Sequence, residues 1–443
     1  MQRMQTRVLV KTFDDRVGRS FEVHRHVLSN GLQLLIVENP AIPAVAINAS
    51  VLAGARHEPE AKAGLAIMAS RLLDEGTATR SSLDIAEAIE SAGGHLEADG
   101  SFERIVVAST ILKQDLDLGL DLVADLLIHP IFPEEYIAKE KTRTLSEIAS
   151  AKDRPQVIAG WAFNELVYGT HPLHRPSHGY PETVEQITRQ DLIDFHKQFF
   201  VPNNVILSIV GDFKISEILP LVERRFGAWV ARPVEFPEVP APVRQTARRE
   251  KYITMTAQQL NIYLGHLGIE RANPDYYILQ VLDTILGGGA GFTARIPQRL
   301  RDELGLAYTT FASITMTAGL DPGRFIAYIG TSPDNMKLAI EGLLNEIRRI
   351  VDEPVTPDEL QDAQDFLTGS FVFAFESSSQ IARFLIHAHV YGLGFDFIEK
   401  YPRLVRAVTA ADIARVARQY LDSENYSLVV VGPVAEDGTV VEP

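Results

Sequence analysis

Two stretches of this chain, TRQDLIDFHKQFF at residues 188–200 and TAADIARVARQYL at residues 409–421, decide how its fold is interpreted. Each begins with a threonine that is followed three residues later by an aspartate, a variant of the capping box that starts a helix. Each leads into an apolar segment closed by a glycine, VILSIVGD at 205–212 and YSLVVVGP at 426–433, which is typical of a buried strand. The chain therefore contains the same helix and strand twice.

Two further pairs of segments match at the same spacing. HPIFPEEYIAKEK from His129 corresponds to DEPVTPDELQDAQ from Asp352, and each opens a helix at a proline followed by an acid, where proline fits the first turn. ELVYG ending at Gly169 corresponds to AHVYG ending at Gly392. The nearly constant offset of about 220 residues indicates a tandem duplication.

The duplication predicts two homologous domains joined by a linker. The expected segments are an N-terminal extension at 1–21, a first domain at 22–229, a linker at 230–248, a second domain at 249–436 and a tail at 437–443. The linker is rich in proline and carries scattered charges, which is typical of an extended connection.

Strands and helices are mixed within the first domain. The β-branched, alternating segments predict strands at 32–39, 44–54 and 104–112. Apolar residues at helical spacing predict helices at 61–74, 82–93, 115–127 and 133–151. This order favours the α+β class, with each domain a mainly antiparallel sheet that has helices packed on one face.

Composition excludes several classes of function. The 443 residues carry a formal net charge of −16, which argues against nucleic acid as the main partner. There is no cysteine, so thiol catalysis, disulfides and thiolate metal sites are excluded. No segment approaches the roughly 18 apolar residues that a membrane helix needs.

The helix at 64–77, GLAIMASRLLDEGT, carries a resemblance to a known family. It is similar to a helix of the zinc metallopeptidases of the pitrilysin, insulysin and mitochondrial-processing-peptidase type. In active members this helix bears His-x-x-Glu-His shortly before a Gly-Thr. Counted back from the Gly-Thr of this chain, the three positions hold Ile67, Ser70 and Arg71. An aliphatic side chain, a hydroxyl and a permanent cation cannot replace two imidazoles and a base.

The resemblance also implies a third zinc ligand, a glutamate farther along the chain. Glu147 stands at the corresponding spacing. It is interpreted either as a relic that now pairs with Arg71 or as a solvated helix glutamate. In both interpretations we expect this chain to bind no metal.

Three histidines in HPLHRPSH, His171, His174 and His178, form the densest group of ligand-type residues. Two prolines interrupt the segment, so the histidines cannot share a helical face. The segment also resembles an ordinary structural loop of the same family. We therefore expect no metal there.

The second half contains a further match to the family between residues 286 and 313. Arg301, Gly305 and Tyr308 resemble its second-domain pattern Arg-x-x-x-x-Gly-x-x-Tyr. The resemblance implies that Arg301 orients the substrate and that Tyr308 donates to the oxyanion formed during peptide hydrolysis. The alternative is an amphipathic helix, a glycine cap and a strand with no catalytic role.

A run of glycines lies just before this pattern. No Gly-Lys-Ser/Thr follows it, so it is not a phosphate-binding loop. It is interpreted either as a substrate-binding loop, as the resemblance implies, or as a tight turn between helices. The glycines are Gly287, Gly288, Gly289 and Gly291.

The resemblance also implies a strand to which a substrate adds by main-chain hydrogen bonding. The segment expected to act as this edge strand is ASVLAGARHEP at 49–59.

Taken together, these features predict a non-zinc-binding subunit of a heterodimeric zinc metalloendopeptidase. A homologous subunit would hold the zinc, and the substrates would be peptides or unfolded proteins. The alternative is a catalytically inactive homologue that acts as a structural scaffold or a peptide-binding chaperone. The N-terminus has no apolar run typical of a signal peptide, which favours the cytoplasm, or the periplasm if a signal was removed earlier.

Overall fold

The computed structural model describes residues 7–8, 21–288 and 293–441. It contains two compact units, and neither is continuous in sequence. The first unit comprises the described residues up to Ile148 together with Pro176–Val239 and Val372–Glu399. The second unit comprises Ala149–Arg175, the described residues of Pro240–Phe371, and those from Lys400 onward.

The first unit is built on a seven-stranded sheet with the order β1-β2-β3-β7-β4-β6-β5. All neighbouring strands are antiparallel except β3 and β7, which run parallel. The strands are β1 (Arg7–Val8), β2 (Val23–Val27), β3 (Gln33–Glu38), β4 (Ala44–Val51), β5 (His95–Gly100), β6 (Ile105–Leu112) and β7 (Val205–Gly211).

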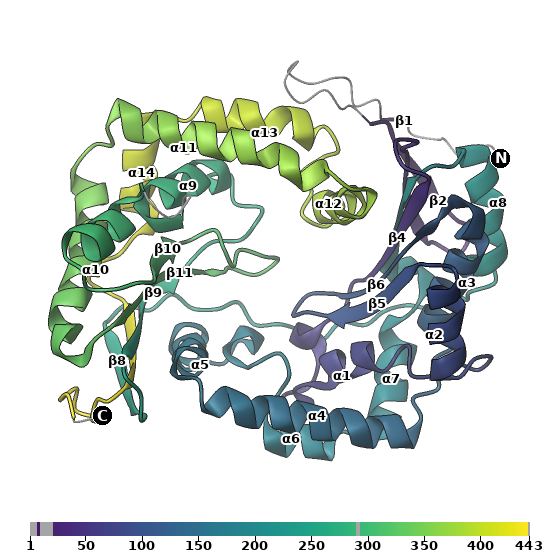
Figure 1. Cartoon of the computed structure of the whole chain (residues 1–443), viewed down its shortest axis with the longest axis horizontal. Helices are drawn as coiled ribbons and strands as arrows, with labels where there is room; N and C mark the ends of the chain where they lie inside the picture. The colour runs from purple at the N-terminus through teal and green to yellow at the C-terminus, as the bar shows by residue number, and fades with distance from the viewer. Residues whose placement is uncertain (1–6, 9–20, 289–292, 442–443) are drawn as a thin grey trace. The chain divides into compact units, whose positions relative to one another are not determined.

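Helices cover both faces of this sheet (Figure 1). Helix α3 packs on β4 and β6, and α8 packs on α3. Helix α12 (Ser378–Val390), which comes from the second half of the sequence, packs on β3, β4 and β7 from the opposite face. The other helices that begin in this unit are α1 (Leu65–Arg71), α2 (Ser82–Ser91), α3 (Leu116–Ile128), α4 (Glu134–Lys152), α6 (Pro181–Gln186), α7 (Arg189–Phe199), α8 (Ile215–Phe226) and α13 (Phe397–Arg406).

The second unit repeats this plan on a five-stranded sheet with the order β10-β11-β9-β12-β8. Strands β8 and β12 are parallel and the other pairs are antiparallel. The strands are β8 (Arg249–Thr254), β9 (Leu260–Leu267), β10 (Thr310–Ser313), β11 (Arg324–Thr331) and β12 (Ser427–Gly432).

Helix α5 (Pro155–Tyr168), from the first half of the sequence, covers one face of this second sheet through contacts with β9 and β12. Phe163 is fully buried there against Val429 and Val431. Helix α10 contacts β9 and β11. The remaining helices are α9 (Tyr276–Asp283), α10 (Met336–Asp352), α11 (Pro357–Ser370) and α14 (Ala410–Tyr420).

The structure confirms the predicted α+β class with two homologous units, but the expectation that helices pack on one face of each sheet is wrong, because helices cover both faces. Thr188 and Thr409 cap α7 and α14 through capping boxes with their aspartates. The strands that follow, β7 and β12, are buried along their whole length because both faces of each sheet are covered. The covering helices, α5 and α12, are the ones that end in the matching segments ELVYG and AHVYG, so the two halves of the sequence exchange equivalent helices.

The matching glycines at the ends of these two strands have the same structural role. Gly211 has φ +158°, and a Cβ there would lie 2.4 Å from the carbonyl oxygen of Ala44. A Cβ on Gly432, where φ is +147°, would lie 2.7 Å from the carbonyl oxygen of Gln259. At both positions only glycine allows the close approach of the neighbouring strand.

The expectation that residues 49–59 form an edge strand is wrong. Residues 49–51 belong to β4, which is hydrogen-bonded to β7 on one side and to β6 on the other. The remaining residues of this segment lie in loops and a short 3-10 helix, η1 (Ala55–His57). The edge of the first sheet that lies beside β6 is β5, a polar strand that the apolar pattern does not predict.

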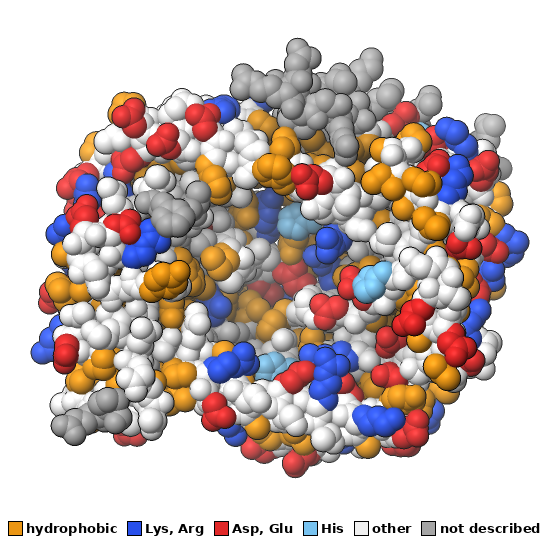
Figure 2. Space-filling model, in the orientation of Figure 1, with side chains coloured by type: hydrophobic (Ala, Val, Ile, Leu, Met, Phe, Trp, Pro, Cys, Tyr) orange, Lys and Arg blue, Asp and Glu red, His pale blue; other side chains and the backbone are white. Residues whose placement is uncertain are grey.

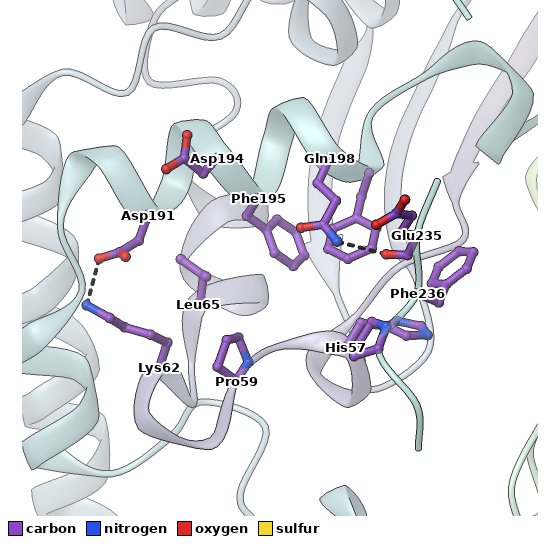
Figure 3. A pocket seen from close by; sticks show the side chains of 12 residues that line it. His57, Pro59, Lys62, Leu65, Asp191, Asp194, Phe195, Gln198, Glu235 and Phe236 are labelled. Carbon is purple, nitrogen blue, oxygen red and sulfur yellow. Dashed lines mark hydrogen bonds and ion pairs between the residues drawn. The ribbon is translucent and has the colours of Figure 1, made fainter. Parts of the chain in front are cut away.

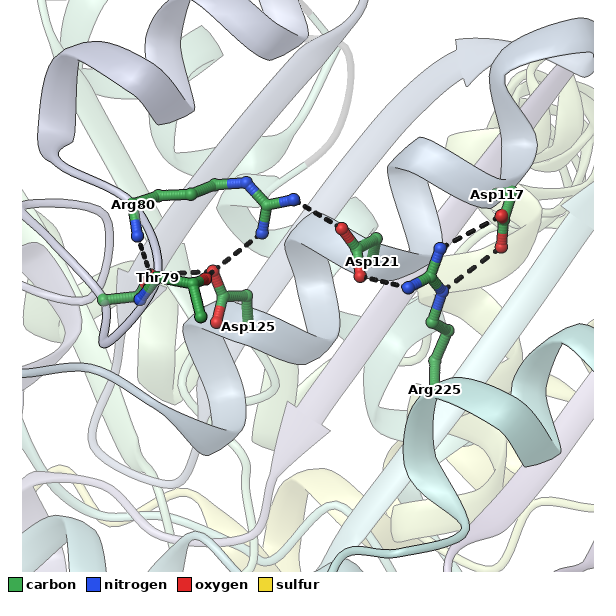
Figure 4. A network of polar contacts seen from close by, with 7 residues as sticks. Thr79, Arg80, Asp117, Asp121, Asp125 and Arg225 are labelled. Carbon is green, nitrogen blue, oxygen red and sulfur yellow. Dashed lines mark hydrogen bonds and ion pairs between the residues drawn. The ribbon is translucent and has the colours of Figure 1, made fainter.

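An ion-pair network holds α8 and the loop before α2 against α3 (Figure 4). Asp117, Asp121 and Asp125 follow one another at helical spacing on α3. Arg225 of α8 pairs with Asp117 and Asp121, and Arg80 pairs with Asp121 and Asp125. Because each arginine bridges two carboxylates, the network neutralises a face of α3 that would otherwise repel itself.

Residues 231–245 have no regular secondary structure, as expected for the proline-rich linker. Acidic and basic side chains are interspersed on the face shown in Figure 2 rather than separated into patches of one sign. Within the described ranges, no helix is both long and apolar enough to cross a membrane.

Candidate functional site

Helix α1 carries the three positions that correspond to the zinc motif, and a buried glutamate fixes its start. The carboxylate of Glu58 accepts hydrogen bonds from the backbone N–H groups of Gly64 at 2.8 Å and Ala66 at 2.9 Å. A carboxylate at this end complements the helix dipole. Gly64 has φ +100°, and a Cβ there would lie 2.6 Å from the carbonyl oxygen of His178. The first turn of α1 is therefore tightly positioned.

Ile67 and Ser70 are packing residues in this structure. Ile67 is 7% exposed and Ser70 is fully buried, with its hydroxyl donating to the carbonyl oxygen of Ile67 at 2.8 Å. Gly100, at the end of β5, comes so close that a Cβ there would lie 2.8 Å from Ser70 Oγ and 3.0 Å from Ile67 Cδ1. The space beside these two positions is filled by the neighbouring strand.

Arg71 bridges two glutamates of α4. Its Nη1 donates to Glu140 Oε1 and to Glu147 Oε2, both at 2.9 Å. Glu140 is buried, whereas the side chain of Glu147 is 40% exposed and also accepts from Arg143. Partial burial opposes the charge on Arg71, but the hydrogen bonds that it donates to the two glutamates outweigh this effect and raise its pKa. Burial by itself would raise the pKa of Glu147, but the hydrogen bonds and positive charges of Arg71 and Arg143 outweigh this effect and lower the pKa.

The pairing of Arg71 with Glu147 is the contact that the relic interpretation of Glu147 expects. The partnership with Glu140 was not predicted from the sequence. The sequence pattern that could have predicted this contact is weak. Glu140 and Glu147 lie about two turns apart on the same face of α4, and this spacing is common on solvated helices.

The residues present do not fit zinc. A guanidinium has no lone pair to donate and carries the same sign of charge as the metal. It already occupies both carboxylates that would otherwise be available. Over the residues that the structure describes, no group of three or more histidine, aspartate or glutamate side chains is arranged to hold a metal ion.

Two of the three histidines at 171–178 form hydrogen bonds with the local backbone. His171 is buried, its Nδ1 accepts from the backbone N–H of Leu173 at 3.2 Å, and its Nε2 lies 3.7 Å from Asp321 Oδ2. His174 Nδ1 contacts the carbonyl oxygen of His171 at 2.8 Å. Burial lowers the pKa of His178, and this effect outweighs the opposing influence of Glu147.

Arg301 and Tyr308 lie on either side of a glycine turn in the second unit. Arg301 belongs to the π-helical segment η7 (Pro297–Glu303), and Gly305 adopts φ +62° two residues after that segment ends. Leu300 and Leu306 are buried on the two sides of the turn and fix it to the core. Between these anchors and β10, Tyr308 projects outward with 90% of its surface exposed.

The guanidinium of Arg301 is held by its neighbour Asp302. Nε donates to Oδ1 at 2.8 Å and Nη2 donates to Oδ2 at 3.2 Å. Asp302 raises the pKa of Arg301, and the nearby hydroxyl of Tyr308 adds to this effect. Arg301 and Tyr308 therefore flank the same turn, and the side chain of Tyr308 is accessible to a ligand.

The glycine run begins in a second π-helical segment, η6 (Thr284–Gly288), at the end of α9. Gly287 is buried, and a Cβ there would lie 2.4 Å from the backbone nitrogen of Ala312, so its small size is required for packing. Gly288 is exposed. Gly289 and Gly291 lie outside the described residues.

Two family descriptions match consecutive parts of the chain. Residues 33–179 match insulinase (peptidase family M16), and residues 186–367 match the peptidase M16 inactive domain. An uncharacterized zinc protease of Rickettsia bellii is 30% identical over 412 residues, covering 92% of this chain and 96% of that protein. The uncharacterized zinc protease YmxG of Bacillus subtilis is 27% identical over 424 residues, covering 93% and 98% of the two chains.

Solved structures share the fold. A peptidase M16 inactive domain from Pseudomonas fluorescens superimposes with a TM-score of 0.87 at 24% identity, covering 95% of this chain and 100% of that one. A protease from Helicobacter pylori superimposes with a TM-score of 0.86 at 21% identity, covering 94% and 100%.

Proposed function

Because this chain belongs to peptidase family M16, the insulinase family, we propose that it is the non-zinc-binding subunit of a heterodimeric metalloendopeptidase. A homologous subunit carries the metal in this proposal. The present chain supplies Arg301 and Tyr308, and the glycine run that begins at Gly287 helps to bind the peptide.

The observation that carries the proposal is the state of helix α1. Ile67 and Ser70 are packed into the core, and Arg71 is committed to Glu140 and Glu147. In this region the former metal-site positions stabilise the fold, because the ion pairs of Arg71 hold α1 against α4. In contrast, Tyr308 exposes a large aromatic side chain that contributes little to the core.

Arg301 and Tyr308 suit the recognition of a peptide bond during hydrolysis. A guanidinium forms a rigid fork of donors that can hold substrate carbonyl or carboxylate oxygens. A tyrosine hydroxyl can donate to the oxygen on which negative charge develops in the transition state. In this proposal both side chains contact the substrate from the surface of this chain, and neither needs a metal bound to this chain.

Strand β5 offers a place where a peptide main chain can add to the first sheet. It pairs with β6 on one side and has no strand on its other side among the described residues. Its side chains alternate between exposed and half-buried. In this proposal a substrate binds by strand addition beside β5.

The test is to co-express this chain with a homologous subunit that contains His-x-x-Glu-His and to measure cleavage of unfolded protein. Tyr308→Phe is expected to reduce the rate by about 100-fold or more, because removing one oxyanion donor typically costs that much. Arg301→Ala is expected to reduce it by about 100-fold, because the substrate is no longer held in position. The two subunits are expected to co-purify as before. Arg299→Ala is the matched control, because Arg299 lies in the same segment and pairs with Glu303 on the surface.

Full activity of both variants would rule out the proposed roles of Arg301 and Tyr308. Stoichiometric zinc and peptide cleavage in the purified chain alone would rule out the division of labour. If the partner is equally active without this chain, the alternative of an inactive scaffold or peptide-binding chaperone is favoured instead.

A further inference from the structure

A second candidate binding site lies in the first unit, beside the start of α1. It is a pocket of about 420 Å³ between α7, the loop before α1 and the start of the linker (Figure 3). This volume lies within the range of small-ligand sites. The loop contributes η1 and the short segment η2 (Glu60–Lys62), and the linker contributes residues 235–237.

Aromatic rings form much of the pocket wall. Phe195 and Phe199 of α7 are buried, whereas Phe236 of the linker is 46% exposed. The ring of His57 lies 4.9 Å from that of Phe236 and 5.9 Å from that of Phe199, measured between centroids. Phe199 and Phe236 are themselves stacked at 5.7 Å. Rings arranged in this way can bind a cation through their faces.

The basic groups of the pocket are already engaged in hydrogen bonds. Lys62 Nζ donates to Asp191 Oδ2 at 2.8 Å and to the carbonyl oxygen of Gln186 at 2.6 Å, so its charge is neutralised. His57 Nδ1 accepts from the backbone N–H of Gly54 at 3.2 Å. The ring nitrogen that accepts this bond cannot at the same time donate to a ligand.

Two carboxylates on the rim remain without a basic partner among the described residues. Asp194 accepts a hydrogen bond from the neutral amide of Gln190. Glu235 is exposed, and its carbonyl oxygen accepts from Gln198 Nε2 at 2.8 Å, which fixes the linker over α7. With Lys62 and Asp191 cancelling each other, the pocket therefore has an excess of negative charge.

We propose that this pocket binds the side chain of an arginine in a peptide. A guanidinium is planar, it stacks on aromatic rings, and its apolar stem suits the wall formed by Leu65 and Phe195. Its charge complements Asp194 and Glu235. The open rim, bordered by the exposed Glu235 and Phe236, leaves room for the main chain of the peptide outside the pocket.

The experiment measures binding of short labelled peptides to the purified full chain by fluorescence anisotropy. One peptide carries a single arginine between alanines and glycines with blocked ends, and a second carries citrulline, which has the same shape without the charge. The arginine peptide is expected to bind at least about tenfold more tightly, with an affinity that falls as salt is added.

Variants of the pocket locate the site. Asp194→Asn combined with Glu235→Gln is expected to weaken binding of the arginine peptide by about tenfold, and Phe236→Ala is expected to weaken it several-fold. Glu238→Gln is the matched control, because Glu238 is an exposed acid of the same linker that does not line the pocket. Circular dichroism of each variant verifies that the fold is retained.

Equal binding of the citrulline peptide, or unchanged binding by the double variant, would overturn the proposal. Free argininamide that binds as tightly as the peptide would overturn the assignment to a peptide. Because the chain is tested without a partner, these results are independent of the activity assay for Arg301 and Tyr308.

Discussion

At the scale of single residues, Arg71 replaces a possible metal site by an ion pair. Its guanidinium supplies the positive charge that holds Glu140 and Glu147 together, and these two glutamates lie on a different helix from Arg71. Glu140 is 7% exposed, and a carboxylate at such a position is costly unless it is paired. Arg71 therefore has a stabilising role.

Removing Arg71 is expected to destabilise the chain. Arg71→Ala leaves the buried Glu140 with only the longer contact to Arg143 at 3.8 Å and the hydroxyl of Thr144, and we expect a loss of about 1.5–3 kcal/mol in the free energy of unfolding, measured by urea denaturation. Arg143→Ala serves as the comparison, because the side chain of Arg143 is 62% exposed and contacts Glu147 at 3.0 Å but Glu140 only at 3.8 Å, and its removal is expected to cost less than about 1 kcal/mol. Equal losses in the two variants would contradict the stabilising role of Arg71.

The sequence predicted part of this site for a clear physical reason. The side chains Ile67, Ser70 and Arg71 exclude a metal by their chemistry alone, whatever the fold. The importance of Glu140 depends on how α4 is rotated against α1, and a helix with many acids does not show which of them faces inward. The projection of Tyr308 likewise depends on the turn at Gly305.

At the scale of elements, the residues just before η7, the segment that carries Arg301, are attached to α11 by an ion pair between Arg295 and Glu359. Arg295, which is 6% exposed, donates from Nε and Nη2 to the two carboxylate oxygens of Glu359 at 2.7 and 3.0 Å. Burial opposes the charge on Glu359, but the hydrogen bonds from Arg295 and Thr356 outweigh it and lower its pKa to about 2.

This pair predicts a pH-dependent contribution to stability. The pKa of Glu359 in the folded chain lies below its ordinary value of 4.5, so the contribution is complete above pH 4.5 and is lost as the pH falls toward about 2. Glu359→Gln is expected to lower the free energy of unfolding by about 1.5–3 kcal/mol at neutral pH, and the difference from the unmodified chain is expected to shrink with acid.

Urea denaturation of both proteins at several pH values measures this difference. Glu353→Gln is a suitable control, because Glu353 pairs with Arg349 through a side chain that is 61% exposed. A difference that does not change with pH would show that Glu359 acts through packing rather than through its charge.

Some elements were predictable from the sequence and others were not. Long periodic or apolar segments, such as those that became α3 and β7, were located within a few residues. Strand β5, HLEADG, was missed because its alternation is short, its inward side chains are only leucine, alanine and glycine, and it contains no β-branched residue. The same pattern explains why the wrong strand, at 49–59, was expected to form the edge.

At the scale of the whole molecule, the duplication does not produce two independent halves. Helix α5 belongs to the first half of the sequence but packs on the second sheet, and α12 does the reverse. The sequence repeat shows that the two helices are equivalent but not which sheet each one covers. The apolar face of a helix does not specify which sheet it packs on, so this exchange could not be predicted from the sequence.

The exchange predicts that neither half of the sequence folds alone. Residues 22–229 without α12 would expose one face of β4 and β7, and α5 would lack the sheet that buries Phe163. Burying one such side chain contributes about 1.5–3 kcal/mol, so several together approach the whole stability of a domain. We expect each half to bind hydrophobic dyes and to show no cooperative thermal transition, whereas the two halves expressed together assemble.

The control separates the break in the chain from the loss of the exchanged helix. A protease site inserted next to Val243, which is 81% exposed, allows the linker to be cut after folding. The cut chain is expected to stay folded, because both exchanged helices are already in place on their sheets. If residues 22–229 alone unfold cooperatively and retain near-ultraviolet circular dichroism, the first half forms a complete core, and the exchanged helices are additions to the fold rather than part of what makes it stable.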